Sequence, residues 1–474
     1  MSVFRLNCID PSNGERVALI YDSEKSTLKY EDGRYAVEPL PESERKKPRE
    51  FQRTKLGDKN IKRHEIKFLR VVLGTKCNYK CAYCSQAFDA PEEQSTSIGD
   101  VDKFMSRLDE WLSGEPKRIE LWGGEPLVYI KFLRKMLPKL REKFPNTQIT
   151  TITNGSLLTD AIVDFLVKYK VAFSISHDAY GQSIRGDDIL DDPKKIAIID
   201  RASRLVDQVF YPTRSFTFNT TFNKKVIDPI KAREFFVKKF GHDMLVSADP
   251  VLAVGRAEID KDTIPSDEQL PEFAQNVATA AMLHPDMSAY SLFRYERNFI
   301  NGLKNQTPMD KVGQKCDVDR DSSLVVDILG NVYTCQNFVK KGDVKGSVYK
   351  FDDIHIKNVQ HFSNRKCCRS CPFVHLCMGG CPAIQGNAFA ETCKIKFAYY
   401  AGLFVPAIYH ACGLIPVSIE AESPILFPVK ELIQTNHGKH FPLTTVNLPN
   451  VDWKRYQKYA QEVSHERLLR SGSN

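Results

Sequence analysis

Between about residues 65 and 260 the chain alternates short apolar runs with longer segments of helical spacing. Runs rich in β-branched and aromatic residues predict strands at 68–73, 119–121, 148–153, 171–176 and 216–220. Apolar residues three and four apart predict helices over 101–112 and 132–140. Repeated strand-then-helix units favour an α/β fold, with a parallel sheet that binds ligands at the carboxyl ends of its strands.

Polar residues stand where several of these strands are expected to end. They are Asn154, Ser174, Ser176, His177, Asp178 and Asn219. Because such side chains also cap helices and close turns, capping remains an alternative to ligand binding at each position.

The two ends of the chain show other patterns. Strand-like runs at 17–21 and 35–37, with Asp32-Gly33 as a hairpin signal between them, predict a small β-meander. Residues 397–417 carry no formal charge and are long enough to span a membrane. Prolines and His410 interrupt that segment, so a buried helix covering the cysteine-rich region before it is favoured. A surface helix is expected at 453–469.

Composition and net charge indicate the compartment of the protein and the place of its excess positive charge. The chain has 474 residues, a length that is enough for two or three domains. Of these residues 42% are hydrophobic, which supports ordinary cores. No apolar signal segment follows Met1, so the 13 cysteines indicate metal ligands in a reducing cytoplasm rather than disulfides. Residues 45–70 carry eleven Lys and Arg against three acidic residues, which matches the whole net charge of +8. This stretch can bind phosphates or an acidic peptide, or it can be a solvated linker.

Three closely spaced cysteines carry the clearest chemistry. Cys77, Cys81 and Cys84 have the spacing C-x3-C-x2-C, with Tyr83 before the last. Three thiolates leave a tetrahedral zinc site one ligand short, but they can hold three irons of a 4Fe–4S cube and leave the fourth open. Zinc or coincidence would remain an alternative for these cysteines alone. About forty residues later, an apolar strand ends in Gly-Gly-Glu at 123–125.

The cysteine motif followed at this distance by Gly-Gly-Glu resembles the radical SAM superfamily. The resemblance implies a partial barrel of six βα units, with S-adenosyl-L-methionine chelated by the open iron of a catalytic 4Fe–4S cluster. One electron would then release a 5'-deoxyadenosyl radical, which abstracts hydrogen from an unactivated carbon. The expected cofactor contacts are Tyr83, Gly123, Gly124, Glu125, Asn154, Ser176 and Arg256. A surface ion pair is the alternative for Arg256.

Seven further cysteines form a second pattern, C-x13-G-x4-C followed by C-x2-C-x5-C-x3-C and one more cysteine. The pattern resembles the SPASM domain, which implies two auxiliary iron–sulfur clusters, with zinc as the alternative. By the family's arrangement, the first cluster is bound by Cys316, Cys335 and Cys381. The second is bound by Cys368, Cys371, Cys377 and Cys393.

Residues beside these cysteines leave some alternatives open. Asp317, Asp319 or a substrate atom could complete the first auxiliary cluster, or it could stay open. Cys367 adjoins Cys368, so a register one residue earlier is an alternative. In sulfatase-maturing relatives an aspartate base follows the cysteine equivalent to Cys335. Gln336 stands here and cannot serve as a base, which puts sulfatase maturation in doubt.

These patterns divide the chain into four parts. We expect an N-terminal β-meander with a basic linker (1–64), a radical SAM core (65–310), a Cys-rich SPASM domain (311–396) and a C-terminal helical extension (397–474). The protein is expected to be cytoplasmic, with no membrane contact. A one-electron donor such as flavodoxin or ferredoxin is the expected partner.

The resemblance favours a peptide or protein side chain as the substrate, modified by rearrangement, coupling or oxidation. The absence of a winged-helix peptide-recognition domain weakens dependence on a leader peptide. An alternative is a phage-type radical SAM isomerase acting on a hypermodified thymidine in DNA. The basic stretch favours it, as does the sequence at 176–182, where peptide-modifying relatives show Asp-Gly-Pro. A non-enzymatic iron–sulfur or zinc protein, the third hypothesis, would leave Gly-Gly-Glu without a purpose.

Overall fold

The computed structural model describes residues 2–48, 53–86, 96–210, 215–253, 257–283, 290–339, 341–420 and 425–427. Its main sheet has eight strands in the order β11-β10-β4-β5-β6-β7-β8-β9. Six consecutive parallel strands form the barrel: β4 (Phe68–Val72), β5 (Arg118–Trp122), β6 (Gln148–Thr153), β7 (Val171–Ser176), β8 (Phe218–Phe222) and β9 (Val246–Pro250). The predicted α/β partial barrel is confirmed. The chain pattern had indicated five of these strands and missed β9.

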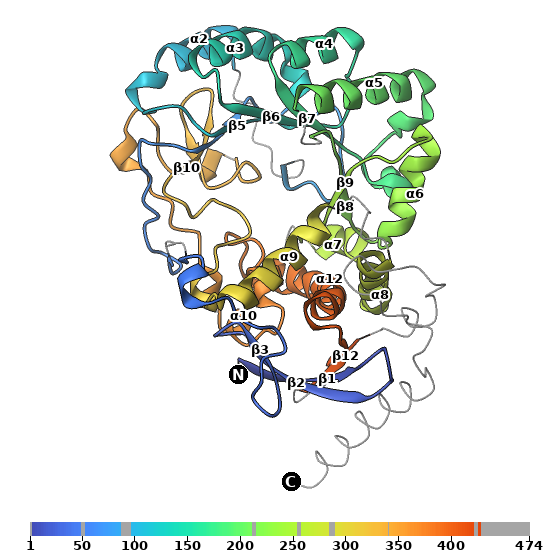
Figure 1. Cartoon of the computed structure of the whole chain (residues 1–474). Coiled ribbons are helices and arrows are strands. Elements are labelled where there is room, and N and C mark those ends of the chain that lie inside the picture. The colour runs from blue at the N-terminus through green and yellow to red at the C-terminus, as the bar shows by residue number, and fades with distance from the viewer. Residues whose placement is uncertain are drawn as a thin grey trace.

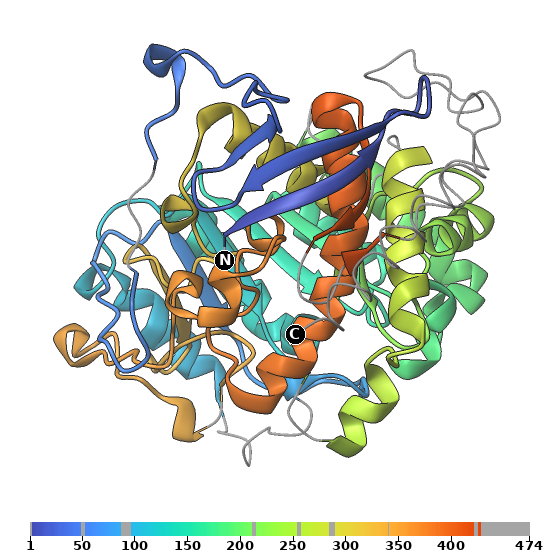
Figure 2. The same cartoon turned by 90° about the horizontal axis from the view of Figure 1, so that it is seen from below.

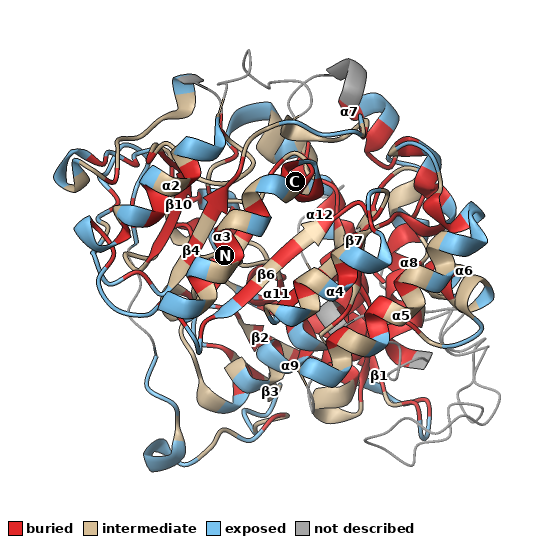
Figure 3. Ribbon diagram, turned by 90° about the horizontal axis from the view of Figure 1, so that it is seen from above, coloured by how far each residue is buried: buried red, intermediate tan, exposed pale blue. Residues whose placement is uncertain are grey.

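Helices join the parallel strands and cover the outside of the sheet (Figure 1). They are α2 (Ile98–Ser106), α3 (Ile130–Lys143), α4 (Asp160–Lys168), α5 (Pro193–Val209) and α6 (Pro229–Phe240). Aspartates cap α5 and α6, each followed by a proline in the first turn, where a missing N–H costs nothing. Figure 3 shows these helices exposed on the outside and buried against the strands.

Short 3-10 helices occur mainly in the loops. They are η1 (Glu42–Glu44), η2 (Leu108–Glu110), η3 (Pro126–Tyr129), η4 (Ala179–Ile184), η5 (Ile189–Asp191), η6 (Met309–Lys311), η7 (Lys341–Asp343), η8 (Phe351–Asp353) and η9 (Phe362–Asn364). The helix predicted at 101–112 is therefore α2 followed by η2.

The cysteine-rich region extends the barrel sheet instead of standing apart from it. β10 (Ser323–Asp327) pairs in parallel with β4, and β11 (Val332–Tyr333) pairs with β10. The helices α10 (Lys366–Arg369) and α11 (Val374–Cys377) follow. Cys316 and Cys335 thereby flank strands of the same sheet that carries the first motif, whereas Cys368, Cys377 and Cys393 lie on helices.

A second sheet brings strands from residues 3–30 together with strands from residues 415–426, in the order β13-β12-β1-β2-β3. Its strands are β1 (Val3–Ile9), β2 (Arg16–Asp22), β3 (Thr27–Tyr30), β12 (Ile415–Ile419) and β13 (Ile425–Leu426). The expected N-terminal antiparallel strands are present, but the strand predicted at 35–37 is wrong, because Tyr35 makes only an isolated bridge to Lys29. β1 escaped prediction because Arg5 and Asn7 interrupt its apolar run; Asn7 donates to Ser418 of β12.

The apolar segment near residue 400 lies in the long buried helix α12 (Gly386–Cys412). It begins well before residue 397 and ends at Gly413, which adopts the left-handed conformation, so Pro416 falls in β12 instead. α12 packs mainly against α8 (Gln269–Leu283) and α9 (Tyr290–Asn305), and the N-terminal strands lie across it (Figure 2). The short helix α7 (Ala257–Thr263) precedes α8.

None of the helices in the described ranges is long and apolar enough to cross a bilayer. The surface helix expected at 453–469 lies outside the described residues.

Close packing of α12 on α8 yields a stability prediction. A Cβ at Gly402 would lie 2.5 Å from the carbonyl oxygen of Ala274, whereas one at Gly302 in α9 would meet nothing closer than 3.4 Å. Both glycine-to-alanine changes gain about 1 kcal/mol of helix propensity. We expect Gly402→Ala to be less stable than Gly302→Ala by about 1–3 kcal/mol, because overpacking outweighs that gain. Denaturant unfolding of the two variants measures the difference, and equal stabilities would contradict this packing.

Candidate functional site

The first cysteine motif lies on the loop after β4, docked against the loop after β5. Gly124 N donates to Gly74 O at 3.0 Å, and Glu125 N donates to Lys76 O at 2.8 Å. Along this loop Cys77 is exposed, Cys81 is buried and Cys84 is half-buried. The backbone of the Gly-Gly-Glu segment therefore fixes the start of the cysteine loop.

Only glycine fits at the centre of this contact. A Cβ on Gly124 would lie 2.4 Å from Thr75 O and 2.5 Å from Lys76 O, and neither backbone atom can give way cheaply. Gly124 is one of the expected cofactor contacts, and glycine lets backbones approach closely. At Gly124 the close approach shown by the structure is to the cysteine loop itself.

Glu125 ties this loop to the next strand. Its carboxylate is buried and accepts hydrogen bonds from Thr153 Oγ1 at 2.6 Å, Asn154 N at 2.7 Å and Leu127 N at 3.0 Å. Burial raises the pKa of Glu125, while these donors oppose the rise. Three protein donors thus already use this side chain, and its expected contact with the cofactor stays a prediction.

Two other expected cofactor residues, Asn154 and Ser176, lie at strand ends. Asn154 follows β6, donates from Nδ2 to Asn78 Oδ1 of the cysteine loop at 2.9 Å, and accepts from Ser156 N, so it holds the loop and closes a turn. Ser176 is the last residue of β7 and is half-buried, in register with Asn219. Arg256 lies outside the described residues.

Sequence reasoning missed a buried network behind the cysteine loop. Tyr83 donates to Asp178 Oδ2 at 2.6 Å, and Arg185 donates to the Tyr83 hydroxyl at 2.6 Å. Asp178 is fully buried and also accepts from Thr221 N at 3.0 Å. No spacing rule links these residues, since they meet only once β7 and the loop after it are folded against the cysteine loop.

This network acts on the cysteine motif. Burial raises the pKa of Cys81 to about 11, and the Arg185 guanidinium opposes the rise. Burial also raises the pKa of Cys77. Thiolates rather than thiols bind metal, so loading this motif must release protons, and Arg185 favours that release.

The seven later cysteines fall into two electrostatic groups. Cys335 and Cys381 each raise the pKa of Cys316, and Cys381 raises that of Cys335, although burial is the largest cause in both cases. In the second group Cys377 and Cys393 raise the pKa of Cys371, after burial. Cys381 thus acts electrostatically on Cys316 and Cys335, while its assignment to the first cluster stays a prediction of the SPASM resemblance.

The second group surrounds a cavity of about 340 Å³. Its lining contains the cysteines Cys367, Cys368, Cys371, Cys377, Cys381 and Cys393. Cys367 is exposed whereas Cys368 is buried, yet both border this space, so the alternative register stays open.

The donor sets suit polynuclear clusters better than single ions. One zinc ion gathers four ligands within about 2.3 Å of a point. Across the described ranges, no three His, Cys, Asp or Glu side chains are grouped closely enough to hold one metal ion. An iron–sulfur cluster instead binds each thiolate on a different iron, which fits cysteines spread around a cavity.

The two candidate fourth ligands of the first group differ in their surroundings. Asp317 acts electrostatically on Cys316 and Cys335, and it pairs with Arg70 of β4 at 2.8 Å. Asp319 is buried, its carboxylate oxygens lack hydrogen-bond partners, and burial raises its pKa to about 6. Asp317 therefore lies nearer the group, while either aspartate remains a candidate.

Parts of the chain are similar in sequence to known proteins. Residues 71–210 match the model of the Radical SAM superfamily. The chain is 21% identical over 383 residues to the radical SAM cyclopropyl synthase TigE of Paramaledivibacter caminithermalis, covering 76% of this chain and 74% of that protein. It is 34% identical over 104 residues to a GTP 3',8-cyclase of Clostridium perfringens, covering 21% of this chain and 30% of the cyclase.

Solved structures share the fold. Native anSMEcpe with bound AdoMet aligns with a TM-score of 0.51 and 16% identity over 72% of this chain and 99% of that one. Its complex with AdoMet and the Kp18Cys peptide aligns at 0.50 with 17% identity, over the same shares. Together with the six-stranded parallel barrel and the three cysteines after its first strand, the match over residues 71–210 supports the place of this chain in the radical SAM superfamily.

Proposed function

We propose that this chain is a radical SAM enzyme with two auxiliary iron–sulfur clusters, and that it modifies a side chain of a peptide or protein. When bound at Cys77, Cys81 and Cys84, the catalytic cluster supplies the electron that cleaves S-adenosylmethionine to a radical able to take a hydrogen atom from carbon. The grouping of the later cysteines into two sets supports the auxiliary clusters most directly.

The chain's own residues prepare this chemistry. Gly124 and Glu125 hold the cysteine loop against the barrel, and Glu125 also fixes the end of β6. Tyr83 and Arg185 hold the loop in place, because Tyr83 donates to Asp178 and accepts from Arg185. Ser176 and Asn219 stand half-buried at the ends of adjacent strands, where a parallel sheet presents its ligand-binding rim.

The choice of a peptide or protein substrate draws on the relatives. The match to TigE spans about three quarters of both chains, and a solved structure with the same fold holds a peptide. Gln336 still argues against sulfatase maturation, since an amide is no base at neutral pH.

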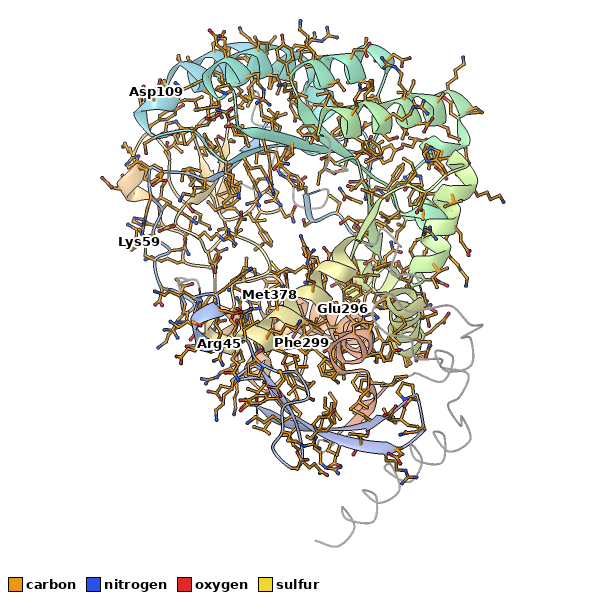
Figure 4. The ribbon with its side chains drawn as sticks, viewed as in Figure 1. Arg45, Lys59, Asp109, Glu296, Phe299 and Met378 are labelled. Atoms are coloured by element: carbon orange, nitrogen blue, oxygen red, sulfur yellow. The ribbon has the colours of Figure 1, made fainter. Side chains whose placement is uncertain are left out.

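The DNA alternative drew partly on the basic stretch 45–70, and several cations of that stretch are paired with other groups of the chain. Lys62 donates to two backbone carbonyls at 2.8 and 2.6 Å, Arg63 pairs with Asp321 at 2.6 Å, and Arg70 is buried between two carboxylates. Arg45 and Lys59, well separated along one side of the molecule (Figure 4), each donate to a backbone carbonyl. This favours a linker over a phosphate clamp.

A substrate-fraction assay tests the proposal. The protein is reconstituted anaerobically with iron and sulfide, reduced and given S-adenosylmethionine, and 5'-deoxyadenosine is measured with peptide or nucleic-acid fractions of host cells. We expect the peptide fraction to stimulate its formation. Stimulation by nucleic acid alone, lost steeply with added salt, would favour the DNA alternative, and no cleavage under any condition would overturn radical SAM chemistry.

Iron content tests the assignment of the first motif. Replacing Cys77, Cys81 and Cys84 together by alanine should remove about four irons per chain and abolish S-adenosylmethionine cleavage, because one cube is lost. Cys412→Ala is the matched control, since Cys412 fits no motif and its thiol contacts Ile408 O. Unchanged iron in the triple variant, or equal loss in the control, would refute the assignment.

Removing the Tyr83 hydroxyl tests the bracing network. Tyr83→Phe leaves the buried Asp178 and Arg185 each without one partner, so we expect a loss of about 1–3 kcal/mol of stability and slower S-adenosylmethionine cleavage. Tyr79→Phe on the same loop loses only an exposed bond to Asp187 O and should change stability little. Thermal unfolding and 5'-deoxyadenosine formation report the two effects; equal behaviour of the two variants would show that the network does not brace the loop.

A further inference from the structure

A buried lysine faces the cavity of the second cysteine group. Lys396 lies on α12 one turn after Cys393, is 5% exposed and lines the cavity. A Cβ on Gly380 would lie 3.0 Å from Lys396 Nζ, so the ammonium lies over the Gly379-Gly380 turn, between Cys377 and Cys381 in the chain. Within the described ranges, no hydrogen bond or ion pair joins this ammonium to another group.

Two other cations near this cavity already have hydrogen-bond partners. Arg365 donates to the carbonyl oxygens of Gly379, Cys381, Pro382 and Ile384, and so holds the loop that carries Cys381. Lys315 pairs with Asp249 at 2.5 Å and donates to Tyr400 at 3.3 Å. Lys396 differs from both, because its ammonium makes no hydrogen bond or close ion pair among the described residues, although Asp249 acts on it electrostatically.

The charge of Lys396 depends on the anions around it. Burying an unpaired ammonium is costly, so a buried lysine that persists needs an anion close by. Burial raises the pKa of Cys377, and Lys396 opposes that rise. Burial lowers the pKa of Lys396 and the Lys315 ammonium lowers it further, whereas the Cys377 and Cys381 thiolates and the Asp249 carboxylate raise it. These two cysteines belong to different groups, so Lys396 stands within electrostatic reach of both.

We propose that Lys396 sets the redox balance of the auxiliary clusters by raising the reduction potential of the second cluster, and to a smaller extent that of the first. The inference rests on the proposed function, since it requires iron–sulfur clusters in both cysteine groups. Reduction adds one electron to a cluster that its thiolate ligands already make anionic. A fixed positive charge at the cavity wall stabilises the reduced state more than the oxidised state.

A redox titration tests this role. Full-length protein carrying alanine at positions 77, 81 and 84 is loaded with iron and sulfide, so that only auxiliary clusters contribute, and their reduction is followed by electron paramagnetic resonance. Lys396→Met should lower the equilibrium constant for reduction of the second cluster about tenfold, a shift of about 59 mV to more negative potential. Lys396→Arg, which keeps the charge, should restore most of that shift.

Lys394 provides the control on the same helix. It is half exposed and pairs with Glu391 at 3.2 Å, so Lys394→Met should leave both potentials unchanged. Unaltered potentials in a fully loaded Lys396→Met variant would overturn the inference. If that variant fails to load, Lys396→Gln replaces it, with the same expected shift and the same disproof. Absence of any auxiliary signal in the parent protein would instead overturn the two clusters themselves.

Discussion

The structure depends on one backbone contact, the docking of the Gly-Gly-Glu segment onto the cysteine loop. Two amide-to-carbonyl bonds join the segments, and a Cβ at Gly124 would collide with the loop backbone. Glu125 extends the contact to Thr153 and Asn154 on the next strand. The loops after β4, β5 and β6 therefore behave as one rigid platform, and an exposed thiol at Cys77 can keep a defined position without being buried.

A second set of contacts joins this platform to the later cysteines. Arg70 on β4 pairs with Glu120 on β5 and with Asp317, the residue after Cys316. β10, which follows, pairs in parallel with β4. Cys316 is thus attached to the same strand that leads into the first cysteine loop. Fixed spacing between the proposed clusters requires such shared elements, because separately folded domains would drift relative to one another.

Much of this arrangement could be predicted from the sequence, and its limits have physical causes. Strands such as 148–153 and 171–176 were found to the residue, since their buried apolar runs end at clear turn signals. Strand β1 was missed because its polar residues find distant partners: Asn7 bonds to Ser418 on β12, and Arg5 to Glu420 just after it. The roles of Glu125, Arg185 and Lys396 depend on which buried donors and charges come together in the folded chain. The spacing of residues along the sequence does not predict those contacts.

Pairing of β1 with β12 places Leu6 opposite Ile419, so the first strand of the chain finds its neighbour near the end of the described residues. During synthesis the barrel, the cysteine loop and both later cysteine groups leave the ribosome before that neighbour exists. One edge of β1 stays unpaired meanwhile, as an available site for aggregation. The closing of this sheet is therefore among the last steps in folding of the described part of the chain, because it must wait until β12 has been synthesised.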